Sequence, residues 1–398
     1  MIRARLASLL AACLACACSA TDGSSAPTQA AAASPASVAS VAGDHVESIA
    51  ELRRFYARAP AEWPAPVLDA GVEHRELGLV ARPAPDEDPR LAARVELGEH
   101  LYFDGRLSGT GQMSCASCHD AELGFADGRA TSLGKDARPL KRNAPALLNT
   151  GSRRSWFWDG RAASLEEQAL AVLSNPAEMD ADFEAVVAFL SGSRGYRERF
   201  EAAFGPGPIA MEHVAASIAA YERTFVSDGS SAFDDFLEGD HEALSDAELR
   251  GLHLFRTKAR CLNCHNGPLL SDELFHNAGL TYYGRELQDL GRYEQTRDPA
   301  DVGRFRTPSL RNLGRTAPYM HNGQFDLDGV LNMYNAGMPR PPRRADQKDD
   351  PLFPSKSPLL KQLFLEDEEK ADLKAFLLSL TERRRRVKPP APLAAGDA

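Results

Sequence analysis

Two short stretches of the sequence carry the same set of reactive side chains. SCASCHDAE begins at Ser114 and RCLNCHN begins at Arg260, and in each a CxxC pair is followed directly by a histidine. This pattern attaches c-type haem: the two thiols form thioethers with the haem vinyl groups, and the histidine becomes an axial ligand of the iron. The sequence therefore predicts two covalently bound haems c. The attachment residues are Cys115, Cys118 and His119 in the first copy and Cys261, Cys264 and His265 in the second.

Zinc binding and dithiol chemistry are the alternatives for such cysteines. Zinc sites pair two CxxC clusters at a spacing of roughly 12 to 20 residues. Here the two copies lie 146 residues apart (261 minus 115), which does not suit one shared ion. The four motif cysteines and three near the N-terminus account for all seven, so none remains for a structural disulfide. Haem attachment explains both copies and the histidine in each.

The first twenty residues, MIRARLASLLAACLACACSA, are typical of an export signal: arginines, a short apolar run, then small residues. The apolar run is too short to span a bilayer. Leu10–Cys13 is similar to a bacterial lipobox, so Cys13 is a candidate for lipidation, with Cys16 and Cys18 as competing sites and a plain cleaved signal as the alternative. Residues 21–45, rich in Ala, Ser, Thr and Pro, indicate a flexible tether. We expect a periplasmic protein, either free or lipid-anchored.

Length and charge limit the classes of function. The chain has 398 residues, enough for two or three domains, and its hydrophobic content of 43% is that of a globular protein. A net charge of -10 argues against nucleic acid as a partner. The basic run Arg383–Arg386 is interpreted as the solvated C-terminal end of a helix.

Helical patterns surround both motifs. Gly98–Tyr102 and Gly251–Phe255 each close an amphipathic pattern upstream of a CxxCH copy, starting near Asp88 in one case and at the capping box Ser245–Glu248 in the other. A last helix is expected over residues 366–380. The layout predicts an all-α fold with two tandem cytochrome c-like domains, over residues 85–235 and 236–385.

The region between the motifs suggests more than electron transfer. Ser164–Glu167 is a capping box that opens a helix carrying Gln168, and Pro176 ends it before Glu178. A turn there would bring Gln168 and Glu178 to one side of a pocket. Above a haem, a carboxylate moves a proton between the peroxide oxygens, and an amide holds the peroxide in place. The alternative is that both side chains are simply solvated.

Over about residues 88–380 the sequence resembles the bacterial dihaem cytochrome c peroxidases, including the MauG-type enzymes that oxidise a partner protein. The resemblance rests on the two CxxCH copies and on RNAP (142–145), FWDGRAASLEEQ (157–168), NPAEM (175–179), TPSLRN (307–312) and TAPYMHNG (316–323). It implies that the first haem reacts with peroxide and that the second delivers electrons.

The resemblance also implies roles for individual residues. Glu178 matches the acid-base glutamate, Gln168 the distal glutamine, and Trp158 the tryptophan between the haems, which is otherwise a core aromatic. Asn143, Thr316 and Pro318 match the ligands of a calcium ion between the domains, a set of oxygen atoms suited to that cation. The alternative for Asn143 is an ordinary turn residue.

Two departures from the family pattern concern axial ligands. No histidine lies between His119 and His213, and Lys135 stands about where a distal ligand would be. We therefore predict a first haem that is five-coordinate or weakly water-bound as isolated. For the second haem, the family places methionine or, in MauG-type enzymes, tyrosine. Tyr334 is favoured here over Met333, in a segment one residue shorter than the usual spacing.

The predicted function is reduction of hydrogen peroxide to water, with electrons entering through the C-terminal haem from a small cytochrome c or a copper protein. The alternative is MauG-like oxidation of a partner protein side chain through a high-valent dihaem intermediate. Met333 as the ligand of the second haem would favour peroxide reduction, and Tyr334 as that ligand would favour oxidation of a partner protein. A dihaem electron carrier without enzyme activity is a third hypothesis. The family resemblance also suggests that the protein is a homodimer.

Overall fold

The computed structural model describes residues 48–81 and 87–396. The predicted export signal and tether, with Cys13, Cys16 and Cys18, lie outside the described residues. Within the described ranges, no helix combines the length and the hydropathy needed to cross a membrane.

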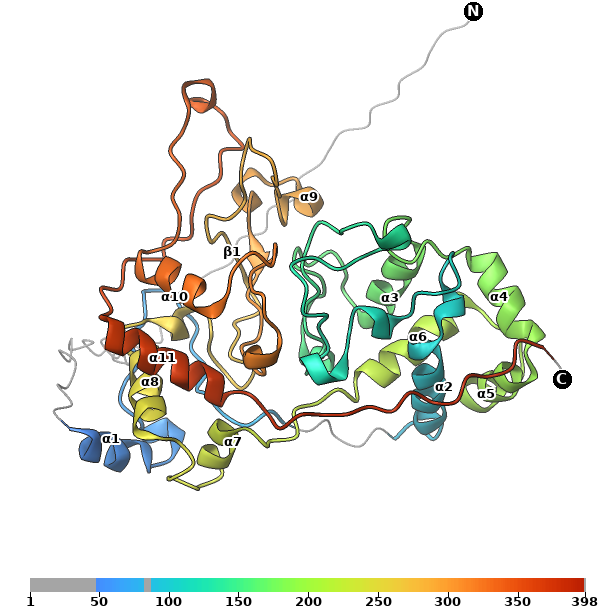
Figure 1. The fold of residues 1–398 in the computed structure, drawn as a ribbon, viewed down its shortest axis with the longest axis horizontal. Coiled ribbons are helices and arrows are strands. Elements are labelled where there is room, and N and C mark those ends of the chain that lie inside the picture. The colour runs from blue at the N-terminus through green and yellow to red at the C-terminus, as the bar shows by residue number, and fades with distance from the viewer. Residues whose placement is uncertain (1–47, 82–86, 397–398) are drawn as a thin grey trace, which may run out of the picture. The chain divides into compact units, whose positions relative to one another are not determined.

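The fold is helix-rich, as predicted, and its helices form two groups that we call lobes (Figure 1). The first lobe contains α2 (Leu91–Phe103), α3 (Leu165–Ser174), α4 (Phe183–Gly192), α5 (Arg194–Phe204) and α6 (Met211–Glu222). The second contains α1 (Ile49–Tyr56), α7 (Ala232–Leu237), α8 (Asp246–Arg256), α9 (Tyr293–Thr296), α10 (Leu327–Asn335) and α11 (Asp367–Ser379). The described strands, β1 (Phe275–His276) and β2 (Phe305–Arg306), form one short antiparallel pair.

The same helix crossing occurs once in each lobe. In the first lobe α2 packs against α6, and in the second α8 packs against α11. A Cβ added to Gly98 would lie 1.9 Å from the carbonyl oxygen of Ser217, and one added to Gly251 would lie 2.0 Å from that of Asp372. Each glycine therefore lets two helix backbones touch.

Aromatic pairs fix the register of the two crossings. Tyr102 and Tyr221 meet edge to face at 5.3 Å, and Phe255 and Phe376 meet in the same way at 5.2 Å. In each lobe the aromatic residue of the first helix lies four residues after the glycine, and its partner lies four residues after the residue whose carbonyl the glycine contacts. Because each CxxCH copy follows the first helix of its pair, the crossing sets the position of both haem-attachment motifs.

Local capping explains where the helices begin. Ser245 and Glu248 form the predicted capping box at the start of α8. The Ser164 hydroxyl accepts a hydrogen bond from the Glu167 amide at the start of α3, but the Glu167 carboxylate accepts from the Ala163 amide, so only the serine half of the predicted capping box forms. α2 begins at Leu91, later than the expected start near Asp88, because the Asp88 carboxylate accepts a hydrogen bond from the Arg90 amide and forms a turn before the helix.

Two segments with little regular structure complete the lobes, and the predicted domain ranges omit most of both. Residues 48–81 pack on the second lobe, where Trp63 and Leu77 join the core around α8 and α11. The C-terminal tail, residues 381–394, runs from α11 to the first lobe (Figure 1). There Leu393 and Val387 contact the core, and the Ser193 hydroxyl donates to the carbonyl of Ala394 at 2.6 Å.

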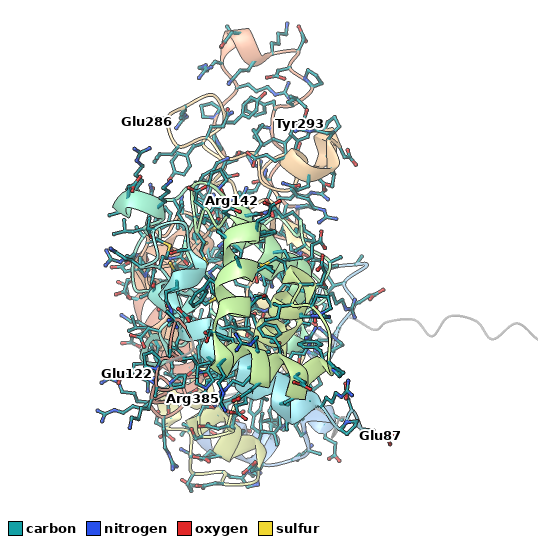
Figure 2. All side chains as sticks on the ribbon, turned by 90° about the vertical axis from the view of Figure 1, so that its right-hand side faces the viewer. Glu87, Glu122, Arg142, Glu286, Tyr293 and Arg385 are labelled. Carbon is teal, nitrogen blue, oxygen red and sulfur yellow. The ribbon has the colours of Figure 1, made fainter. Side chains whose placement is uncertain are left out.

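The basic run lies on this tail, so its prediction as a helix end is wrong. α11 ends at Ser379, and residues 381–394 form no helix or strand. Arg384 and Arg386 form ion pairs with Glu122 at 3.4 and 3.5 Å. Arg385, labelled with Glu122 in Figure 2, donates to the carbonyl of Val226. The arginines therefore hold the tail against the first lobe.

Candidate functional site

A cavity of about 440 Å³ lies beside the first CxxCH motif. Cys115, Cys118 and His119 line it. The Nδ1 atom of His119 lies 2.9 Å from the carbonyl oxygen of Phe125, which makes Nδ1 the donor and leaves Nε2 available as a ligand. Burial lowers the pKa of His119, so its imidazole is neutral and able to bind a metal.

The structure brings Gln168 and Glu178 into the lining of this same cavity. Asn175 folds the turn after α3: its carbonyl accepts from the Glu178 amide at 2.9 Å, and its side chain accepts from the Ala177 amide at 3.0 Å. This turn directs Glu178 back towards the helix that carries Gln168. Burial raises the pKa of Glu178, and the nearby Arg161 guanidinium acts in the opposite direction.

Two residues near the first motif could cap the first haem: Lys135, which stands at the expected distal position in the sequence, and Met113. Lys135 is not among the residues that line the first cavity, and its ammonium group is paired with Asp180. Met113 does line the cavity. His119 is the one histidine among the described residues of this lining.

A second cavity, of about 250 Å³, lies beside the second motif and is lined by Cys261, Cys264 and His265. The Nδ1 atom of His265 lies 2.9 Å from the carbonyl oxygen of Leu270, so its Nε2 is also free. Tyr334 is part of the lining and Met333 is not. The lining side chains of α10 share one helical face, Leu327, Val330, Leu331 and Tyr334, which turns Met333 away. Burial raises the pKa of Tyr334 above its usual range.

A shared wall separates the two cavities. Trp158 lines both, and its indole N–H donates to the carbonyl of Asn143 at 2.9 Å. Its ring also meets that of His321 edge to face at 6.4 Å. Arg153 lines both cavities as well, a position that the sequence reasoning did not single out.

An ion-pair network stands at one end of this wall. Arg142 makes two hydrogen bonds to the Asp289 carboxylate, at 2.7 and 2.8 Å, and one to Asp159 at 2.6 Å. Arg142 holds the pKa of Asp289 down at about 2. Figure 2 labels Arg142 and Tyr293, the first residue of α9. The network ties the RNAP segment to the second-lobe loop before α9.

The candidate calcium ligands are partly brought together. The Asn143 side chain lies 3.5 Å from the carbonyl oxygen of Pro318 and donates to that of Arg129 at 2.8 Å. Thr316 is two residues from Pro318, and both line the second cavity. Its hydroxyl donates to the carbonyl of Leu313.

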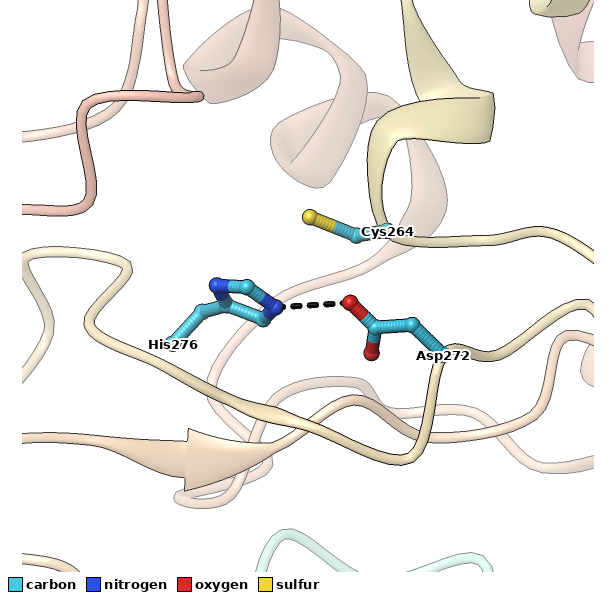
Figure 3. A group of neighbouring side chains, drawn as sticks. All are labelled: Cys264, Asp272 and His276. Carbon is cyan, nitrogen blue, oxygen red and sulfur yellow. Dashed lines mark hydrogen bonds and ion pairs between the residues drawn. The ribbon is translucent and has the colours of Figure 1, made fainter. Parts of the chain in front are cut away.

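A further cluster, Cys264, Asp272 and His276, has a spacing that could hold a metal ion (Figure 3). The His276 Nε2 and Asp272 Oδ2 atoms are 2.8 Å apart. Cys264 is the second thiol of a CxxCH motif, so its sulfur is the one expected to bond to haem. Cys264 and His276 belong to the wall of the second cavity, and Asp272 is hydrogen-bonded to His276.

Comparisons with known proteins agree with this arrangement. Residues 92–242 match the family model for di-haem cytochrome c peroxidase. The chain is 37% identical over 328 residues to cytochrome-c peroxidase IdrP1 of Pseudomonas sp., covering 75% of this chain and 83% of that protein. It is 38% identical over 302 residues to the methylamine utilization protein MauG of Methylorubrum extorquens, covering 75% and 81%.

Solved structures show the same relationship. A MauG-like protein associated with microbial copper homeostasis matches with a TM-score of 0.65 and 33% identity, over 80% of this chain and 96% of that one. The diheme peroxidase BthA of Burkholderia thailandensis matches with a TM-score of 0.62 and 26% identity, over 84% and 98%. The chain belongs to the di-haem cytochrome c peroxidase family.

Proposed function

We propose that the protein is a dihaem c-type peroxidase that reduces hydrogen peroxide to water, with electrons entering through the C-terminal haem. A small cytochrome c or a copper protein would be the donor. The observation that carries this proposal is the first cavity, where Glu178 and Gln168 share a lining with His119. An electron carrier would not need a buried carboxyl and an amide beside one of its haems.

The residues present fit haem. Each cavity offers two thiols and a histidine with its Nε2 free. Arg153 is a cation in the wall of both cavities, and its guanidinium donates to the carbonyl of Ala146 at 2.5 Å. Burial lowers its pKa to about 9, and the carboxylates of Glu273 and Glu222 act in the opposite direction. The two carboxylates of a haem would be further anionic partners for this guanidinium.

Haem, when bound, supplies the redox chemistry that cleaves the peroxide O–O bond. Glu178 would accept the proton from one peroxide oxygen and return it to the other, which becomes water. The Gln168 amide would orient the peroxide by hydrogen bonding. Trp158, in both cavity walls, would form the electron route between the two sites.

The test is an electron paramagnetic resonance spectrum of the oxidised protein as isolated, before any reductant is added. We expect one high-spin and one low-spin haem signal, because no histidine other than His119 lines the described first cavity. Two low-spin signals would contradict a first haem that is open to peroxide. Met113, which lines that cavity, would then be the first residue to replace.

MauG-like oxidation of a partner protein is a second candidate, and the position of Tyr334 favours it. An anionic oxygen ligand lowers the potential of a haem relative to methionine. We expect Tyr334→Phe to raise the midpoint potential of the second haem and to change its low-spin signal. Met333→Leu is the matched control, since Met333 does not line the cavity. A change of the signal in the Met333 variant alone would assign the ligand to methionine.

Calcium at Asn143, Thr316 and Pro318 is proposed from the family resemblance, with the Asn143 side-chain oxygen and two backbone carbonyl oxygens as ligands. Chelator treatment should then lower peroxide turnover, and added Ca²⁺ should restore it. If turnover does not respond to the chelator, the proposal is wrong.

Export to the periplasm, with lipidation of Cys13 as the anchored form, is proposed from the sequence of residues 1–20. Cell fractionation of the wild type and of Cys13→Ser tests it. A protein found in the cytoplasm would contradict export.

A further inference from the structure

The two helix crossings give an internal alignment of the lobes. Gly98 contacts Ser217 as Gly251 contacts Asp372, and Tyr221 meets Tyr102 as Phe376 meets Phe255. One residue further on, Glu222 corresponds to Leu377. Both line the cavity of their own lobe, and their exposed fractions are similar, 4% and 6%. The first cavity thus holds a carboxyl group where the second holds a leucine.

Hydrogen bonds do not explain why this carboxyl group is buried. The Oε2 atom of Glu222 is buried and has no hydrogen-bond partner in the described chain. The neighbouring Arg223 is engaged by Glu166, with contacts of 2.8 and 3.1 Å. Leaving a buried polar atom unpaired is destabilising, and a leucine at this position would avoid that cost.

The charged and titratable groups around Glu222 come from several elements of the first lobe. Arg153, from the shared wall, and Arg223, the residue directly after α6, favour its ionised form, and Glu166 on α3 opposes it. Cys115 and Tyr102 interact with its charge from the motif and from α2. Burial outweighs both arginines and raises the pKa of Glu222 to about 8. At neutral pH the group therefore holds a proton in the wall of the first cavity.

We propose that Glu222 is the redox-linked proton site of the first haem. Over the pH range in which Glu222 is ionised beside the oxidised haem and protonated beside the reduced haem, reduction by the external donor is accompanied by uptake of one proton from solvent at Glu222, and oxidation by release of that proton. The inference rests on the proposed function, since it requires a haem in the first cavity. The physical cause is the negative charge that one-electron reduction adds to a cavity in which Glu222 is already buried.

The proposal predicts different pH dependence for the two haems. Leu377 cannot bind a proton, so the second haem lacks this coupling at the equivalent position. Glu222 also differs from Glu178, which follows α3 and is assigned to peroxide. Proton uptake at Glu222 offsets the charge of the electron that reaches the first site. It thereby favours electron arrival there at lower pH.

The test is the midpoint potential of each haem in the full-length holoprotein, measured by spectroelectrochemical titration between about pH 6 and pH 10. In the wild type, the potential of the first haem should fall as pH rises through the pKa of Glu222, because the reduced state binds the proton more tightly. Glu222→Gln and Glu222→Leu, the residue of the other lobe, should both remove this slope. The second haem should keep its wild-type profile in both variants.

Glu382→Gln is the matched control. Glu382 is a buried carboxyl group whose pKa is also raised by burial, and it lines neither cavity. Its replacement should leave both potentials and their slopes unchanged. An infrared difference spectrum between the reduced and oxidised protein should contain a protonated-carboxyl band that Glu222→Gln loses.

Three outcomes are distinct. A preparation with only one haem would overturn the proposed function itself. Two haems with an unchanged pH slope in Glu222→Gln would overturn only the role of Glu222. If Glu222→Leu fails to fold, Glu222→Gln, which keeps the side-chain shape, still decides the matter.

Discussion

Replacing Glu178 with glutamine is expected to lower peroxide turnover by about 10² to 10⁴-fold, the usual contribution of a positioned general acid-base group. The amide keeps the shape of the side chain and cannot accept the peroxide proton. The measurement is steady-state oxidation of a reduced cytochrome c by hydrogen peroxide. Haem content should be unchanged, because Glu178 does not belong to either attachment motif. Wild-type turnover in this variant would remove Glu178 from the mechanism.

Glu198→Gln is the control for this experiment, since Glu198 is exposed on α5 and pairs only with Arg194 among the described contacts. The pH profile gives a second readout. The working form of Glu178 is the carboxylate, so activity should fall as pH falls through its pKa, which burial places above the ordinary value. Arg161→Gln removes the cation that opposes this shift, and the acidic limb should move to higher pH. If the acidic limb of the pH profile does not move in Arg161→Gln, Arg161 does not influence the pKa of Glu178.

Replacing Gly98 with alanine is expected to destabilise the first lobe by roughly 3 kcal/mol, at the upper end of the cost of overpacking. The new Cβ would lie 1.9 Å from the carbonyl oxygen of Ser217 and 2.9 Å from the Cβ of Tyr221. Helix backbones cannot yield by that much without separating α2 from α6. Gly251→Ala should do the same to α8 and α11, where the contact is 2.0 Å.

Thermal unfolding followed at the two haem absorption bands would measure this effect. Gly192→Ala is the control, because an added Cβ at Gly192 meets no atom within 4 Å. Equal stability of Gly98→Ala and Gly192→Ala would mean that the helix crossing is not close-packed as described.

Several parts of the fold and the site could be predicted from local signals. The capping serines placed the starts of α3 and α8, and the apolar spacing placed α11 within a residue at each end. Pro176 after α3 predicted the turn that brings Glu178 into the same cavity lining as Gln168. These features depend on contacts within a few residues, which a sequence displays directly.

Features that depend on distant contacts could not be predicted in this way. Residues 57–81 and the tail form no α-helix or strand, so their packing partners are visible only in the fold. Glu222 lies in an apolar helix, where a single acid is usually solvated, and only the crossing with α2 shows that it is buried. The roles assigned to Glu178, Gln168, Trp158 and Tyr334 stay predictions until the variants are measured.

The path of the chain between the lobes determines the order in which the two lobes can complete their folding. Residues 48–81 belong with helices that are synthesised almost two hundred residues later, and the tail belongs with helices synthesised almost two hundred residues earlier. During synthesis, this surface of the first lobe therefore stays uncovered until residues 381–394 have been made. The first CxxCH motif is made long before the tail that covers part of its lobe.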